Sequence, residues 1–133
     1  MQKQPFSPED TYIYLNADGV ATSVPGGAAF WALTPQEIER FGQGWLISEY
    51  QFDVDWPTWE MHPNADEYVY LLSGAIELYL DEPEGVRIVS ITDQGAVVVP
   101  RGVWHTAKVQ RPCRMLHVTM GAGTQTRPVV GLA

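Results

Sequence analysis

The chain has 133 residues, 45% of them hydrophobic, enough for one domain with a full core and too few for two domains of ordinary size. Its single cysteine, Cys113, excludes an internal disulfide, and its formal net charge of −8 argues against a nucleic-acid partner. No stretch approaches the roughly 20 apolar residues of a spanning helix, and the N-terminus lacks the apolar run of a signal peptide, so we expect a cytoplasmic protein without a membrane partner.

Short runs rich in Val, Ile, Tyr, Trp and Thr recur along the chain, with turn residues between them. This density of short strands favours a barrel or sandwich. The strands we predict are Tyr12–Leu15, Trp45–Phe52, Thr58–His62, Glu67–Ser73, Ala75–Leu80, Val86–Ile91, Ala96–Val99, Trp104–Val109 and Arg114–Met120.

One helix is predicted near the N-terminus. Thr34, Pro35 and Glu37 have the spacing of a capping box with proline at the first helical position, and Gly42 can end the helix about two turns later. The segment after Gly121 is rich in Gly, Thr and Pro, and we expect it to pack loosely or to reach a partner subunit.

The charges are unevenly placed along the chain. Residues 41–86 contain no Lys or Arg but ten acidic residues, whereas the balance reverses from Arg87 onward. Two interpretations stay open: solvated faces that complement each other across a sheet or a dimer contact, or a region that attracts cations.

Two segments contain the residues best suited to chemistry. Glu60 and His62 are two apart on a predicted strand and therefore share a face, and Glu67 opens the next strand. If these strands pair as a hairpin, Glu67 returns opposite His62. In the second segment His105 follows a turn and shares its face with apolar residues, so it also points toward an apolar interior.

Both segments resemble the two motifs of the cupin family. The first is similar to H-x-H-x(3,4)-E-x(6)-G and reads Glu60-x-His62-x(4)-Glu67-x(6)-Gly74. The second is similar to G-x(5)-P-x-G-x(2)-H-x(3)-N and reads Gly95-x(4)-Pro100-x-Gly102-x(2)-His105. The resemblance implies a single cupin domain over residues 1–133, all-β, with a double-stranded β-helix (jelly-roll barrel) and one short N-terminal helix. It also implies that one divalent metal ion is bound by Glu60, His62, Glu67 and His105.

The chain departs from the family pattern at three points. Glu60 replaces the usual first histidine, the loop from Gly95 to Pro100 is one residue shorter, and Val109 stands at the position of the final asparagine. Two carboxylates close together in an apolar cavity repel each other, and a divalent cation relieves that repulsion. Carboxylate and imidazole ligands suit Mn, Fe, Ni or Zn. The alternative is a barrel that keeps only the fold, with Glu60 as a residue of its rim.

His117 lies on a predicted strand, where it is either a proton carrier in the cavity or a structural residue. Trp56 has the strand parity of Glu60 and could stack on a ligand, whereas Trp59 and Trp104 are expected outside the cavity.

Three functions remain open. The first is a metal-dependent enzyme, an oxygenase, isomerase or lyase, that acts on a small polar molecule inside the barrel, with Glu60 or His117 moving protons. The second is a non-catalytic module that binds or senses a small molecule, and the third is a structural role. By analogy with small cupins, we expect a homodimer.

Overall fold

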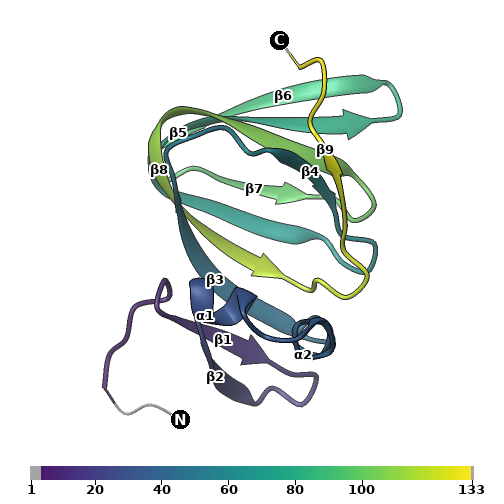
Figure 1. Cartoon of the computed structure of the whole chain (residues 1–133). Helices are drawn as coiled ribbons and strands as arrows, with labels where there is room; N and C mark the ends of the chain where they lie inside the picture. Colours follow the sequence, from purple (N-terminus) through teal and green to yellow (C-terminus); the bar gives the residue numbers. More distant parts are fainter. Residues whose placement is uncertain (1–3, 133) are drawn as a thin grey trace.

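The computed structural model describes residues 4–132, which form antiparallel β-strands and two short helices near the N-terminus (Figure 1). All-β architecture is therefore as predicted. The elements in chain order are β1 (Thr11–Leu15), β2 (Ala21–Pro25), α1 (Ala28–Trp31), α2 (Pro35–Arg40), β3 (Trp45–Phe52), β4 (Thr58–Met61), β5 (Glu67–Glu82), β6 (Gly85–Thr92), β7 (Ala96–Val99), β8 (Trp104–Thr119) and β9 (Gln125–Pro128).

Two long strands, β5 and β8, have 16 residues each and pair along most of their length. The first half of β5 and the second half of β8 belong to one group of strands, in the order β2-β1-β3-β8-β5-β7. The other halves belong to a second group, in the order β9-β4-β8-β5-β6. We call these groups the first and second layers; the arrangement is compatible with a jelly roll.

Gly74 marks the point where β5 passes from one layer to the other. Its φ of +102° is a conformation that residues with a side chain rarely adopt, and a Cβ there would lie 2.6 Å from Cys113 Cα. The pairing with β8 shifts register between Leu71 and Ile76. The sequence predicted a turn at Gly74 and separate strands on each side, but the glycine bends β5 without ending it, because pairing with β8 resumes beyond the bend.

The apolar core comes from residues that alternate along these strands. Ile76, Leu78 and Leu80 are fully buried, as expected for the inward set of their strand, while Glu77 lies on the other side and accepts a hydrogen bond from Gln110. The remaining buried members of this cluster are Val69, Leu71, Ile91, Val99, Ala107, Cys113 and Met115.

The N-terminal part forms a second, smaller core around Tyr12, Val24 and Phe30. The capping box at Thr34 and Glu37 is present, and α2 begins at Pro35 as predicted. Helix α1 and strand β2 were not predicted.

The segment after Gly121 is also more ordered than expected, because β9 pairs with β4. Among the described residues, no helix is long and apolar enough to cross a membrane.

Candidate metal centre

The residues of the candidate site come from both layers. Glu60 lies on β4 and His105 on β8, and these two residues face each other in the strand register of the second layer. Glu67 is the first residue of β5 and pairs with Val99 of β7 in the first layer. The hairpin suggested by the sequence is therefore wrong: β4 pairs with β8 and β9, whereas residues 63–66 cross to the other layer before β5 begins. Glu67 nonetheless reaches His62, across the space between the layers.

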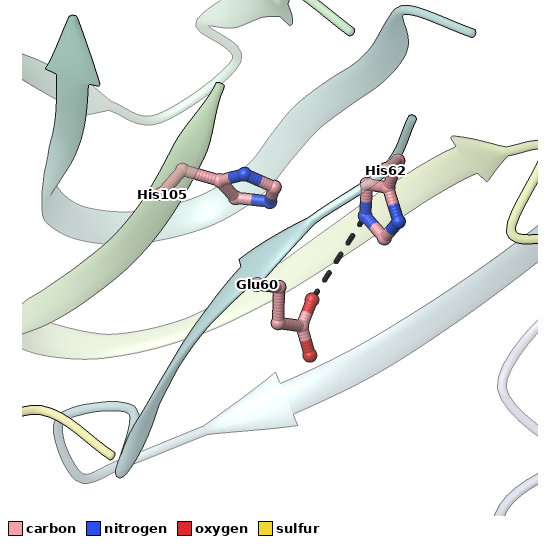
Figure 2. A group of neighbouring side chains, drawn as sticks. All are labelled: Glu60, His62 and His105. Atoms are coloured by element: carbon pink, nitrogen blue, oxygen red, sulfur yellow. Dashed lines mark ion pairs between the residues drawn. The ribbon is translucent and has the colours of Figure 1, made fainter. Parts of the chain in front are cut away.

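Glu60, His62 and His105 point toward one another (Figure 2), and one ligand atom from each lies within 4.8 Å of the others. His62 Nε2 is 4.0 Å from Glu60 Oε2. Both histidines are buried, while the Glu60 side chain is 38% exposed and faces the adjoining cavity. Two imidazoles and a carboxylate at this spacing form a donor set suited to a divalent transition metal.

Glu67 contacts three buried histidines, although it is not one of the three residues whose ligand atoms lie within 4.8 Å of one another. Its Oε1 lies 3.3 Å from His105 Nε2, and its Oε2 lies 3.4 Å from His62 Nε2 and 3.5 Å from His117 Nδ1. Oε2 also accepts a 2.6 Å hydrogen bond from the Thr119 hydroxyl. The contacts with Thr119 and His117 hold the carboxylate on the first-layer side of the site.

The surroundings of Glu67 and His105 favour their charged forms. Burial alone would raise the pKa of Glu67, but the nearby imidazoles of His105, His117 and His62 outweigh burial and lower the pKa well below its usual range. Burial alone would lower the pKa of His105, but its interactions with Glu67 raise the pKa above the usual value. A cation entering the site would therefore compete with imidazole protons for the Glu67 carboxylate.

Hydrogen bonds at Nδ1 set the orientation of both histidines. The Thr124 hydroxyl donates to the Gly121 carbonyl at 2.6 Å, so at 2.8 Å from His62 Nδ1 it accepts the imidazole proton. His105 Nδ1 donates in the same way to the Val103 carbonyl at 3.1 Å. In the neutral form each ring then presents the lone pair of Nε2 to the site, the arrangement typical of metal-binding histidines.

The buried atoms without hydrogen-bond partners provide a test of fit for a metal. Nε2 of His62, Nε2 of His105 and Oε1 of Glu67 are all buried and have no such partner among the described residues. Buried polar atoms without partners are costly, and here they gather at one place. A divalent cation would bind all three atoms together, so these residues are suited to hold a metal ion.

His117 lies beside the same site, on the second half of β8. It is buried and lines the adjoining cavity together with Glu60 and Trp56. Its Nε2 has no hydrogen-bond partner within the described part of the chain. Trp56 lies in the cavity wall, whereas Trp59 and Trp104 hold Arg127 over their rings, at 5.5 and 4.4 Å from the ring centroids.

Thr119 and Thr124 are the residues of the site that the sequence did not indicate. Thr119 shares the strand parity of His117, which was a usable signal. Thr124 lies in the connection between β8 and β9, and no periodicity relates it to His62.

The family of the chain follows from a comparison with known protein families. The family model described as a cupin domain matches residues 52–119, which include all four candidate ligands and His117. The chain belongs to the cupin family. No curated protein gives a significant match to it.

Several solved structures are similar to this chain. A cupin-2 domain containing protein from Shewanella frigidimarina is 14% identical, with a TM-score of 0.48 over 62% of this chain and 71% of the other. Peruvianin-I, a cysteine peptidase from Thevetia peruviana latex, is 14% identical, with a TM-score of 0.54 over 65% of this chain and 58% of the other. A cupin superfamily protein from Desulfitobacterium hafniense is 19% identical, with a TM-score of 0.49 over 56% and 65%. Of these three, the likeness to Peruvianin-I has a TM-score above 0.5, and at 14% identity it concerns the fold alone.

Proposed function

We propose that the protein is a cupin-type metalloprotein that binds one divalent cation through Glu60, His62, Glu67 and His105 and is an enzyme acting on a small polar molecule inside the barrel. The observation that carries the proposal is the convergence of unpartnered buried atoms from His62, His105 and Glu67 beside the Glu60 carboxylate. Mn, Fe, Ni and Zn all suit these ligands. When bound, such an ion supplies a Lewis acid that polarises oxygen atoms of a substrate or of water.

The chain's own residues would contribute proton transfer and exclusion of water. Glu60 is the most exposed of the four ligands, and His117 has an unpartnered Nε2 at the cavity wall. Both side chains are within reach of a molecule in the cavity, so we propose them as the groups that hold or move a proton. Glu67, which accepts a hydrogen bond from Thr119, contacts Nδ1 on the other side of the His117 ring.

Metal binding is tested by metal analysis of protein purified without chelators, followed by melting with and without added Mn, Fe(II), Ni or Zn. At a metal concentration 100 times Kd, binding stabilises the fold by about 2.7 kcal/mol. With 133 residues, the unfolding entropy is about 0.28 kcal/mol/K, so Tm should rise by about 10 °C.

Two buried histidines of this site provide a matched control. His62→Ala should lose the metal-dependent rise in Tm, whereas His117→Ala should keep most of it, because His117 contacts the ligand Glu67 but is not itself one of the proposed ligands. Protein without metal, and a Tm that none of the four ions changes, would contradict the proposal. So would an equal shift in the His62 variant.

A second candidate function is a binding module without turnover. The observation in its favour is the size of the adjoining cavity, about 540 Å³, and the abundance of aromatic side chains in its wall. A ligand that raises Tm and is recovered unchanged after long incubation with the metal-loaded protein would favour this function over catalysis.

The homodimer and the cytoplasmic location expected from the sequence stay predictions. A sedimentation experiment at low concentration that gives only a 14.8 kDa species would contradict the dimer.

A further inference from the structure

The cavity beside the candidate metal centre extends from Glu60 and His62 to helices α1 and α2, with an estimated volume of about 540 Å³. This is a volume typical of small-molecule sites. Its wall is rich in aromatic rings, three from the β3–β4 region and three from the helical region: Tyr50, Phe52, Trp56, Phe30, Trp31 and Phe41.

The aromatic wall continues directly into the candidate centre. The ring of Trp56 lies 5.3 Å from that of Phe52, 6.4 Å from His105 and 6.1 Å from His117, between ring centroids. Tyr50 lies 5.4 Å from His117 in an edge-on arrangement. A planar ring in the cavity would therefore contact aromatic faces and edges while its substituents reach the candidate centre.

The charged side chains of the cavity wall are of one sign. They are the carboxylates of Glu39, Asp55, Glu60 and Glu67. The described residues that line the cavity include no Lys or Arg, and the imidazoles of its wall are those of His62 and His117. Even with a divalent cation bound, Glu60 and Glu67 cancel its charge, and the other two carboxylates remain. An anionic ligand would meet these carboxylates and no Lys or Arg among the described lining residues, whereas a neutral or cationic ligand meets no such cost.

One buried donor in this wall is without a partner. Trp56 Nε1 is buried and makes no hydrogen bond, although indole N–H groups usually find an acceptor when buried. Because Nε1 is covered by protein atoms, an oxygen atom of a bound molecule would supply that acceptor after a small shift of the indole ring.

We infer that the cavity takes a small aromatic molecule that is neutral or cationic rather than anionic and that offers an oxygen acceptor to Trp56. This inference names the ligand class for the proposed function. It rests on that function in one respect, that the ligand and the metal ion occupy the same cavity. The aromatic wall supplies affinity, the carboxylates exclude anions, and the indole N–H orients the polar end of the ligand.

Three probes with one carbon skeleton test the charge preference: 2-phenylethanol, 2-phenylethylamine and phenylacetate. Their affinities are measured by calorimetry on the full chain, first after removal of metals by a chelator and then with zinc. In chelator-treated protein we expect the alcohol to bind at least about tenfold more tightly than phenylacetate, with the amine between them. Equal or tighter binding of phenylacetate to this form would overturn the inference.

The chelator-treated form separates this inference from the metal proposal. If the alcohol binds but the protein retains no metal, the metal proposal fails and the ligand class stands. If metal binds but none of the probes does, the ligand class fails and the metal proposal stands.

Two variants test the individual parts. Trp56→Phe keeps a ring but removes the N–H, so the preference for 2-phenylethanol over ethylbenzene should fall by about fivefold. The double variant Glu39→Gln and Asp55→Asn keeps the acceptors that bind Gly123 and Val109, but should narrow the gap between alcohol and phenylacetate by at least about threefold. Val86→Ala, on exposed β6 and outside the cavity, serves as the control. Unchanged preferences in either test variant would overturn the role assigned to its groups.

Discussion

Substitution of Thr124 by valine tests whether the second hydrogen bond of His62 controls metal affinity. In the wild-type protein, Thr124 accepts the proton of His62 Nδ1 at 2.8 Å because its own proton is donated to the Gly121 carbonyl. Valine has nearly the same shape but no acceptor. The imidazole of Thr124→Val is then free to carry its proton on Nε2, the form that cannot bind a metal through that atom.

The expected loss of metal affinity follows from the removal of the hydrogen-bond partner of His62 Nδ1. The substitution leaves all four candidate ligands in place and removes the polar partner of one of them, a change that usually costs about 10- to 100-fold in metal affinity, or about 1.4 to 2.7 kcal/mol. Because Thr124 is exposed, the cost to folding without metal should be within about 1 kcal/mol.

The assay is competition for Zn²⁺ between the protein and a chromophoric chelator, at constant pH, with melting curves to confirm that the variant is folded. Thr92→Val, on exposed β6, is the matched control and should keep the wild-type Kd. A Kd of Thr124→Val within about twofold of the wild type, from a folded protein, would refute the reasoning, because the partner of His62 would then have no influence on the metal.

Three further predictions concern the framework of the site. Gly74→Ala should lower the free energy of unfolding by more than about 3 kcal/mol in urea titrations, because the new methyl group meets the backbone of β8. Gly85→Ala, also at positive φ but with open space around it, should lower it by only about 1 kcal/mol. Equal losses in the two variants would contradict the steric argument. The carboxylate of Glu49 is 1% exposed and accepts hydrogen bonds of 2.6 and 2.9 Å from Arg114. Arg114→Leu removes both, so the free energy of unfolding should fall by about 3 kcal/mol and largely return when Glu49→Gln is added. No recovery in the double variant would contradict the assignment. Hydrogen bonds from the N–H of Gly74 and from Arg111 lower the pKa of Asp93, so this carboxylate stabilises the fold above its unfolded pKa and loses that contribution as the pH falls. Asp93→Asn should therefore be less stable than wild type near pH 7, with a difference in Tm that shrinks toward pH 3. A difference in Tm that does not depend on pH would refute the assignment.

The sequence predicts the individual strands of this fold better than their pairing. Alternation of apolar and polar residues identifies the inward face of β5, and the box at Thr34 locates the start of α2, because both signals are local. The sequence does not reveal that Gly74 bends a strand instead of ending it. That outcome depends on pairing with β8, which lies far away in the chain.

The candidate site was predictable to the extent that it rests on motif spacing. Glu60, His62 and His105 come together as the cupin resemblance implies. Glu67 also reaches His62, but not through the hairpin suggested by the sequence, because Glu67 approaches His62 from the other layer. Thr124 could not be anticipated, because its position depends on how the connection between β8 and β9 packs against the site.

Placement of the candidate ligands in both layers has a consequence for hydrogen exchange. Glu60 and His105 belong to the second layer, whereas Glu67 belongs to the first, so a cation held by all of them would be a cross-link between the two groups of strands. Separation of the layers would break that cross-link, and metal should therefore slow exchange of backbone amides in β4 and β7 together, although these strands do not pair with each other. The metal would then report on the docking of the two layers, and a partly opened molecule would lose its ion before its individual strands unfold.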